Sequence, residues 1–374
     1  MERRPEVYPQ IRCLLHVLAQ APNCWESISL WLPPTLLEDP VFSPIRTQLS
    51  SLKHLTLHPS ERFGDDKCLE VFRDCPSITS LRLHVIGDRV DPSRFLVPWR
   101  QLTKLHLHWC TFTHVAPILK LCTELEDLSL SFVWTDPMEP EPFVPIVCPR
   151  LKTLSVESFT KDNPLSAVVC MTLPGLSRLD IQIEVAAYYP RNFTRAPLDF
   201  VGFLNRSACT ITELHVRPSL VGNDMQLVRF LDRFPALRIL SVVENQFGEW
   251  REDVELDPDD EDVERLLSAT VITTTFLNRL HAHYRGSPGK TLIPRLTDLT
   301  LSVQGRQLDQ EALVAAVTSR WLPDFGYASE IGVDCLRSLS IRVMEKDLTP
   351  LHTLETLCYL RDAGLRVDIY RVPC

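Results

Sequence analysis

The sequence predicts an α/β fold in which short parallel strands form a sheet on one face of a curved solenoid, with helices on the other face. Two observations lead to this prediction. A pattern of apolar-x-x-apolar-x-apolar occurs eleven times along the 374 residues, mostly at intervals of 23 to 27 residues. Proline is also abundant, with 29 prolines against 12 glycines, whereas average proteins contain more glycine than proline. Many short elements with sharp ends are therefore expected.

Each copy of the pattern predicts one strand with an apolar face, followed by a segment that returns to the next strand. The copies start at Trp25, Leu52, Ile78, Leu102, Leu125, Leu151, Leu176, Ile211, Leu237, Leu296 and Leu336, and a last strand is expected at residues 365–369. Helices are predicted at residues 66–75, 114–122, 198–205, 224–234 and 310–321. The period is that of leucine-rich repeats. Because stacked repeats share one core, we expect a single leucine-rich-repeat solenoid (horseshoe) over residues 1–374.

Prolines and cysteines recur at fixed places before the strands. Five prolines stand two residues before the first apolar residue of a copy: Pro76, Pro149, Pro174, Pro235 and Pro294. Proline there ends the preceding segment and imposes an extended backbone. Three cysteines stand three residues before that apolar residue: Cys75, Cys122 and Cys148. We interpret them as small buried apolar positions rather than as metal ligands or redox groups.

The start of the chain has some features of a secretion signal, because arginines precede an apolar stretch at residues 14–18 and an Ala-Gln-Ala triplet. However, Ile11, Leu14, Leu15 and Leu18 follow the spacing of an amphipathic helix. No apolar run approaches the roughly eighteen residues that cross a bilayer. Twelve cysteines without C-x-x-C pairs fit a reducing compartment. We therefore expect a cytoplasmic or nuclear protein without membrane contact.

No catalytic motif is complete in the sequence. Gly289-Lys290-Thr291 resembles the end of a phosphate-binding loop, but Tyr284 stands where that loop needs its first glycine. The sequence contains no H-E-x-x-H, G-x-S-x-G or G-x-G-x-x-G pattern. We therefore expect a protein that is not an enzyme and that uses no cofactor and no metal.

The repeat register places a row of histidines on the exposed face of the sheet. In each strand, the residues before, between and after the two inner apolar positions point to this face. In three neighbouring copies these positions hold His54, Thr56, His58, Ser80, Arg82, His84, Lys104, His106 and His108. Because parallel strands lie about 4.8 Å apart, we expect His58, His84 and His108 to stack as a ladder.

This basic, histidine-rich end has two interpretations. It is either an ordinary solvated face or a partner-binding patch formed by His54, His58, Arg82, His84, Lys104, His106 and His108. A metal site is not expected, because neither a carboxylate nor a cysteine joins the ladder in register. If the patch binds an acidic partner, binding should strengthen as the pH falls through about 6.5, where histidine gains charge.

Negative charge is concentrated in one segment. The chain has a net charge of -9, and residues 244–264 hold eleven acidic residues and one arginine. We expect an acidic, disordered insertion at residues 244–262, which is either simply solvated or a contact for a basic partner. The calcium-loop pattern is not met around Asp257, Asp259 and Glu261. Residues 263–284 are expected to form a long helix, although the β-branched run at 271–275 favours a strand. The acidic balance predicts no nucleic-acid partner.

Two junctions, Cys75-Pro76-Ser77-Ile78 and Cys148-Pro149-Arg150-Leu151, introduce repeats in the same way. Together with residues 14–18 leading into residues 25–30, they resemble the leucine-rich-repeat portion of fungal F-box proteins. The resemblance covers roughly residues 10–370. It implies that the repeats capture a protein substrate for a ubiquitin ligase. In that family an N-terminal F-box binds the Skp adaptor of the ligase.

The F-box itself is not detected. Residues 32–39 resemble the opening of an F-box, but Pro40 would break the first helix of that module. The strand expected at residues 52–57 also leaves no room for the remaining F-box helices. The Skp adaptor is thus expected as a partner only if an F-box is supplied upstream. The expected function is that of a monomeric protein-binding module, resembling the substrate-recognition part of an SCF-type ubiquitin ligase receptor. The alternative is a free-standing repeat scaffold or competitor that recruits no ligase.

Overall fold

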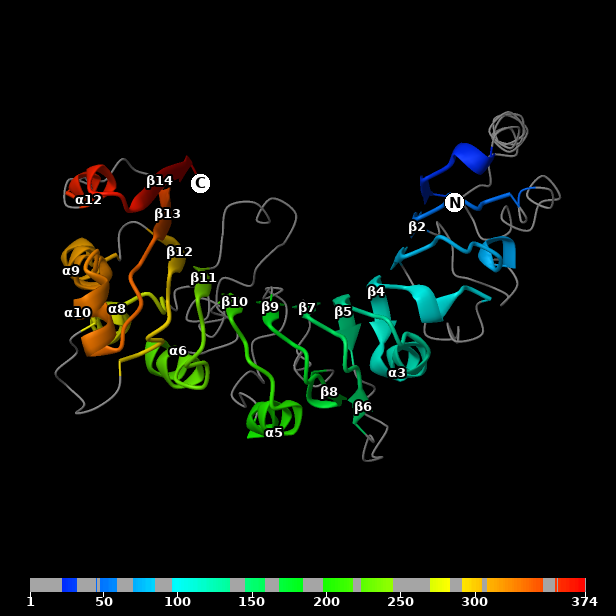
Figure 1. The fold of residues 1–374 in the computed structure, drawn as a ribbon, viewed down its shortest axis with the longest axis horizontal. Coiled ribbons are helices and arrows are strands. Elements are labelled where there is room, and N and C mark those ends of the chain that lie inside the picture. The colour runs from blue at the N-terminus through cyan, green and yellow to red at the C-terminus, as the bar shows by residue number, and fades with distance from the viewer. Residues whose placement is uncertain are drawn as a thin grey trace, which may run out of the picture. The chain divides into compact units, whose positions relative to one another are not determined.

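Parallel strands follow one another in sequence order through the main sheet of the computed structural model (Figure 1). The structure describes residues 22–31, 45, 48–58, 70–84, 96–134, 145–158, 168–183, 198–217, 223–244, 270–282, 291–304, 308–345, 354 and 356–373. Within these residues the sheet has twelve strands in the order β1-β2-β3-β4-β5-β7-β9-β10-β11-β12-β13-β14. All eleven predicted repeats supply one strand each, and the predicted last strand is β14. The fold is therefore mixed α/β with a large parallel sheet.

The strands are short, as the six-residue pattern predicts. Their bounds are β1 Ser27–Leu30, β2 His54–Leu57, β3 Ser80–His84, β4 Lys104–Thr111, β5 Asp127–Trp134, β7 Thr153–Ser158, β9 Arg178–Ile183, β10 Glu213–Val216, β11 Ile239–Val243, β12 Asp298–Gln304, β13 Ser338–Glu345 and β14 Arg366–Pro373. Two further strands, β6 Ile146–Val147 and β8 Met171–Thr172, pair with each other in a separate small sheet.

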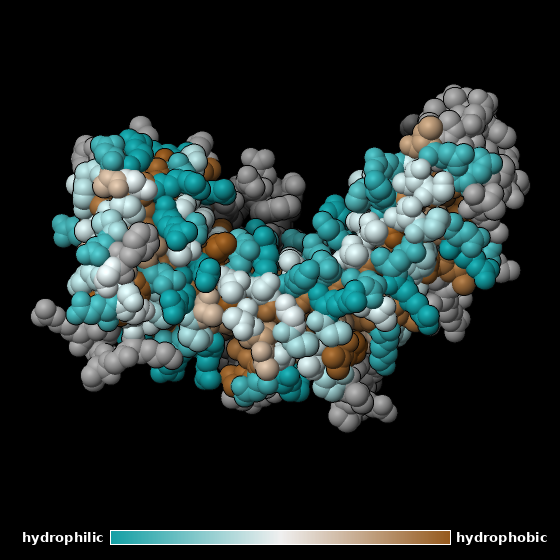
Figure 2. Space-filling view, in the orientation of Figure 1, coloured by the Kyte–Doolittle hydropathy of each residue, from teal (hydrophilic) through white to brown (hydrophobic). Residues whose placement is uncertain are grey.

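The first apolar residue of each repeat from the second onward anchors the core. These residues are 3% exposed or less: Leu52, Ile78, Leu102, Leu125, Leu151, Leu176, Ile211, Leu237, Leu296 and Leu336. Alternate strand residues such as Leu105 and Leu107 are buried on the same face, since successive side chains of a strand point to opposite sides. Figure 2 accordingly shows a largely hydrophilic surface, with hydrophobic side chains visible in scattered areas.

One backbone contact repeats from strand to strand and fixes the register. The carbonyl of the residue that follows the first apolar position accepts two amides from the next repeat. Lys53 O accepts from Thr79 N at 2.9 Å and from Ser80 N at 3.0 Å, and Thr79 O accepts in the same way from Thr103 and Lys104. The same contact recurs at Arg238 O. Equal positions of successive repeats therefore lie side by side.

The chain divides into two compact units. Unit 1 consists of residues 1–155, 164–175 and 202–208, and unit 2 consists of residues 156–163, 176–201 and 209–374. Unit 1 contains strands β1 to β5, and unit 2 contains strands β9 to β14. The expectation of one continuous solenoid over residues 1–374 stays a prediction, and each unit is described by itself below.

Helices lie beside the strands within each unit (Figure 1). Their bounds are η1 Pro22–Cys24, η3 Glu70–Phe72, η5 Trp99–Gln101, α3 Phe112–Leu121, α5 Leu198–Ser207, α6 Asp224–Leu231, α8 Thr274–Leu280, α9 Gln310–Arg320, α10 Phe325–Ile331 and α12 Cys358–Asp362. Side-chain oxygens cap several of them, for example Asn223 at α6 and Asp309 at α9. Four of the five predicted helices, at 114–122, 198–205, 224–234 and 310–321, are thereby confirmed.

The predicted helix at residues 66–75 is wrong within its described part. Only the 3-10 turn η3 forms there, with Val71 and Phe72 buried. Residues 73–77 form turns before the strand, because Pro76 ends the segment. The four other prolines of the set also stand in turns, so their role as punctuation is confirmed.

The junction cysteines are buried, as predicted. Cys75, Cys122 and Cys148 are free thiols at 5% exposure or less. Burial raises the pKa of Cys75 and of Cys122 to about 12 and that of Cys148 to about 11. The thiols therefore stay protonated at neutral pH and act as small apolar groups.

The predicted long helix at residues 263–284 is wrong over residues 270–273. The carboxylate of Glu244 is 3% exposed and accepts hydrogen bonds from the amides of Val271 at 3.1 Å and Ile272 at 3.0 Å. The Thr273 hydroxyl then caps α8 by accepting from Phe276 N. Side chains thus take the amides that a helix would use, and α8 begins only at Thr274.

Glu244 is also a correction to the acidic insertion expected at residues 244–262, because its carboxylate is a buried anchor rather than a solvated charge. Residues 245–262, the apolar stretch at 14–18, the F-box echo at 32–39 and Gly289-Lys290 lie outside the described residues. In the described part of the chain, no helix has both the length and the apolar character to span a bilayer.

Gly175 is expected to be intolerant of a side chain. It lies in the turn before β9, and a Cβ atom there would stand 2.8 Å from Pro149 O and 3.2 Å from Leu151 O. Because both neighbours are backbone, Gly175→Ala should destabilise unit 1 by about 1–3 kcal/mol, measured by urea denaturation. Gly202→Ala is the control, since among the described residues a Cβ atom there would approach the end of a side chain, Arg206 Nη1 at 3.3 Å, rather than backbone. Equal stability of the two variants would contradict the close packing of these turns.

Candidate partner-binding site

The predicted histidine ladder forms on the exposed face of unit 1. The rings of His58 and His84 stack with centroids 3.7 Å apart, and His84 and His108 follow at 4.8 Å. The register explains the row, because His84 pairs directly with His108 across β3 and β4. These ring contacts confirm the predicted ladder, with the rings of His84 and His108 tilted by 42° rather than parallel.

Aromatic side chains extend this row at both ends. The Trp31 indole stacks on His58 at 4.2 Å, and Phe132 meets His108 edge-on at 4.7 Å. Trp109 covers Phe132 at 5.0 Å. We call the set Trp31, His58, His84, His108, Trp109 and Phe132 the ring stack. Its two indoles are the exposed members, with Trp31 at 73% and Trp109 at 44% of full exposure.

The end of the ring stack is built on unusual backbone. Trp109 has φ 59° and Phe132 has φ 57°, a left-handed conformation that bulky residues rarely adopt. The two residues lie opposite each other, because His108 pairs with Ser131 before them and Cys110 pairs with Val133 after them. The matching kinks turn Phe132 toward His108 and expose Trp109. Such conformations cost about 1–3 kcal/mol each and cluster at functional sites.

The other predicted site residues surround the ring stack in different ways. His106 lies 5.7 Å from His84 and 6.3 Å from His108, so it belongs to the same imidazole group. Arg82 is exposed and stands between Thr56 and His106 in register. His54 and Lys104 are exposed at the other end of their strands, in the row with Ser80, and neither joins a ring contact with another described residue. The structure thus gathers five of the seven predicted residues.

The histidines of the site are hard to protonate. Burial lowers the pKa of His84 to about 3, aided by the positive charges of His58, His108, His106 and Arg82. Burial, Arg82 and the neighbouring histidines lower the pKa of His106 to about 4. Burial is also the first cause of the lowered pKa values of His58 and His108. The imidazoles are therefore neutral at pH 7.

This neutrality corrects the expected pH dependence. A gain of charge near pH 6.5 is wrong for His84 and His106, because their pKa values lie far below that of free histidine. The positive charge of this surface at neutral pH comes from Arg82 and Lys104. The site is a neutral aromatic surface with basic residues beside it, rather than a basic histidine cluster.

Two imidazole nitrogens in the stack have no hydrogen-bond partner within the described residues. These atoms are His84 Nε2 and His108 Nδ1, and both are buried. Inner atoms of the rings therefore serve packing rather than hydrogen bonding. No group of three or more histidine, cysteine or acidic side chains in the described part of the chain is placed to hold a metal ion.

No model of a known protein family and no curated protein sequence matches the chain.

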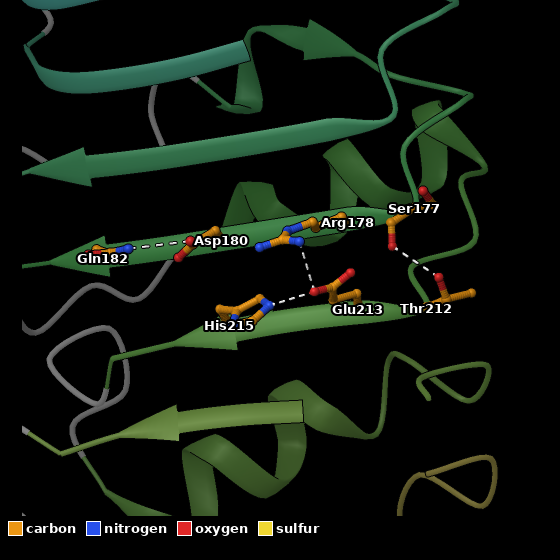
Figure 3. A network of polar contacts seen from close by, with 7 residues as sticks. All are labelled: Ser177, Arg178, Asp180, Gln182, Thr212, Glu213 and His215. Carbon is orange, nitrogen blue, oxygen red and sulfur yellow. Dashed lines mark hydrogen bonds and ion pairs between the residues drawn. The ribbon is translucent and has the colours of Figure 1, made fainter. Parts of the chain in front are cut away.

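A second polar group lies on the sheet face of unit 2 (Figure 3). The Glu213 carboxylate accepts from Arg178 across the strands at 3.0 Å and from His215 on its own strand at 2.8 Å. Asp180 accepts from Gln182 on β9, and the Thr212 hydroxyl donates to Ser177 O. The Arg178–Glu213 and Thr212–Ser177 bonds join the two neighbouring repeats, and Glu213 already has two partners. The group therefore stabilises the sheet and offers no free carboxylate at Glu213 for a ligand.

The sequence contained a signal for some of the residues that were missed. Applying the same register rule to the first repeat gives Trp31, which follows Leu30 as His58 follows Leu57. The rule also gives Arg178 and Glu213 in unit 2. Trp109 and Phe132 had no such signal, because a regular strand would turn both rings toward the core and only their left-handed backbone prevents this.

Proposed function

We propose that this chain is a leucine-rich-repeat solenoid that binds another protein through the ring stack of unit 1, and that it is not an enzyme. The observation that carries the proposal is the pair of exposed indoles at the ends of the stack, Trp31 and Trp109. Tryptophan and arginine dominate the energetics of protein interfaces, and Arg82 lies beside the stack.

The packing of the stack supports binding rather than general solvation. Stacked rings lose little conformational freedom on binding, because their neighbours already hold them in place. Neutral imidazoles also have a lower desolvation cost than charged ones. A partner that covers the indoles therefore gains apolar contact without an ordering cost in the protein.

The resemblance to fungal F-box proteins suggests the biological role. We propose that the bound partner is a substrate of an SCF-type ubiquitin ligase and that the chain is the substrate-recognition part of its receptor. The second candidate is a free-standing scaffold or competitor, which would use the same surface without recruiting a ligase. We further propose an intracellular, monomeric protein.

The partner should depend on the ring stack in a proximity-labelling experiment. A Trp31→Ser, Arg82→Ser variant removes two exposed side chains and leaves the buried strand residues intact. We expect at least tenfold less labelling of the specific partners, because a tryptophan or an arginine that anchors an interface contributes about 2 kcal/mol or more. Labelled proteins would be quantified by mass spectrometry.

Tyr370→Ser is the matched control, because Tyr370 is an exposed aromatic residue on β14 of unit 2. It should label the same proteins as the unchanged chain. If the ring-stack variant also labels them equally, binding through unit 1 is excluded.

Association with the Skp adaptor separates the two candidate roles. A ligase receptor should co-purify with the adaptor from cells that express the chain in its natural reading frame. A scaffold should retain the ring-stack-dependent partner while the adaptor is absent from the purified material.

A further inference from the structure

A pocket of about 420 Å³ opens on unit 2, and none of the residues of the polar group described above is among its lining residues. One side of its wall is formed by residues that stand just before strands β11, β12 and β13. The other side is formed by the end of α10 and the turn that follows it. The lining residues are Arg238, Arg295, Thr297, Ala328, Ser329, Gly332, Val333, Asp334, Cys335 and Arg337. Three arginines thus face one aspartate, and the pocket is positively charged.

The repeat register brings two of these arginines to the same pocket. Thr297 N donates to Arg238 O at 2.8 Å, and Arg337 N donates to Thr297 O at 2.7 Å. Arg238, Thr297 and Arg337 are therefore equivalent positions of three adjacent repeats. With strands about 4.8 Å apart, the two arginine backbones lie about 10 Å from each other, and Thr297 lies between them. Two long side chains can converge on one small anion across this gap.

The third arginine is already engaged. Arg295 Nη1 pairs with Asp334 Oδ1 at 2.8 Å, and Asp334 N donates to Pro294 O, which holds the aspartate in place. Asp334 is thus compensated by Arg295. Arg238 and Arg337 are exposed, and no carboxylate among the described residues pairs with either of them. The excess charge of the pocket comes from these two guanidinium groups.

The lining on the α10 side combines one polar side chain with apolar ones. Ser329 adds a hydroxyl, while Ala328 and Val333 belong to a buried apolar cluster that forms a firm base. Gly332 ends α10 in the left-handed conformation, with φ 68°, and nothing lies within 4 Å of the place where a Cβ atom would be. The backbone therefore leaves open space at this side of the pocket.

We propose that this pocket binds a phosphoryl group, with Arg238 and Arg337 as its two ligands. Guanidinium groups form paired hydrogen bonds with phosphate oxygens, and two of them match the double negative charge of a phosphate monoester at neutral pH. A single carboxylate would leave one guanidinium without a partner. The group belongs either to a small phosphate ester or to a phosphorylated side chain of a protein, and the chemistry of recognition is the same.

Calorimetric titration of the full chain tests this site. The probes are O-phospho-L-serine and a mixed-sequence peptide pool that carries phosphoserine, both at pH 7.5 in 150 mM salt, with serine and the unphosphorylated pool as blanks. We expect saturable binding of O-phospho-L-serine and at least tenfold weaker binding to the Arg238→Gln, Arg337→Gln variant. Arg361→Gln is the control, because Arg361 is an exposed arginine on α12 outside the pocket.

Each outcome decides the proposal. Binding of O-phospho-L-serine that requires Arg238 and Arg337 supports it. If the phosphopeptide pool then binds with higher affinity than O-phospho-L-serine, a protein is the source of the phosphate. Equal affinity of the two probes identifies a small ester instead. Absence of binding to the unchanged chain overturns the proposal, and so does equal binding by the double variant and the control. Circular dichroism of both variants verifies that the fold is intact.

Discussion

Replacing Arg320 by methionine is expected to destabilise unit 2 by roughly 3–6 kcal/mol, enough to lower its urea midpoint sharply. The Arg320 side chain is 1% exposed at the end of α9. Its guanidinium donates to three backbone carbonyls, those of Leu280, Leu292 and Ile293. Methionine fills a similar volume but donates no hydrogen bond, so three buried carbonyls would lose their partner, at about 1–3 kcal/mol each.

The hydrogen bonds to the three carbonyls offset the desolvation cost of burying this arginine. The carbonyls belong to the end of α8 and to the segment before β12, and Leu336 N donates to the Arg320 carbonyl at 2.9 Å. One residue thus joins α8, α9 and the approaches to β12 and β13. Burial lowers the pKa of Arg320 to about 10, which still leaves the group charged at neutral pH.

Two comparison variants make the experiment specific. Arg320→Lys keeps the charge but has no planar fork of donors, so we expect an intermediate loss of stability. Arg361→Met changes an exposed arginine on α12 and should stay within about 0.5 kcal/mol of the unchanged chain. If Arg320→Met unfolds at the same urea concentration as Arg361→Met, the three-carbonyl contact does not stabilise unit 2.

The sequence predicted those features that follow from a repeating local pattern. The apolar alternation placed every strand of the sheet, and the histidine ladder followed from it, because equal positions of neighbouring repeats must lie side by side. Cys75 and Pro76 could be interpreted in the same way, since their distance from the strand is constant. Periodicity therefore identifies both the parallel strands of the sheet and the histidines of the candidate site.

Features that depend on a single long-range contact could not be predicted. Arg320 has the pattern of an exposed residue in the last turn of a helix, and nothing local indicates three carbonyls around it. Glu244 stands at the start of an acidic run, yet its carboxylate accepts hydrogen bonds from the amides of Val271 and Ile272, which follow it by 27 and 28 positions. The pKa values of the histidines likewise depend on how deeply the folded chain buries each ring and on the charged groups around it.

Unit 1 is expected to lose stability as the pH falls from 7 to 5, because its stacked histidines resist protonation in the folded state. His84 and His106 have pKa values of about 3 and 4, and those of His58 and His108 are also lowered. An unfolded histidine takes up a proton near pH 6.5. Below that pH the unfolded chain binds more protons than the folded one, so the free energy of unfolding decreases.

The size of the effect follows from these pKa differences. Each histidine can contribute at most about 1.4 kcal/mol per pH unit below 6.5. The rings are partly exposed and screened by solvent, so we expect roughly 2–4 kcal/mol for the four together between pH 7 and pH 5. Carboxylates titrate mostly below this window. The measurement is the urea midpoint of unit 1 at half-unit steps of pH, followed by tryptophan fluorescence.

His84→Phe isolates the contribution of the stack. Phenylalanine keeps a flat ring between His58 and His108 and removes the two ring nitrogens, one of which has no hydrogen-bond partner among the described residues. The variant should be at least as stable as the unchanged chain at pH 7 and should lose less stability at pH 5. His114→Phe changes a histidine on α3 outside the stack and should keep the original pH dependence. If His84→Phe and the unchanged chain show the same slope, the neutral ladder does not determine the acid sensitivity of unit 1.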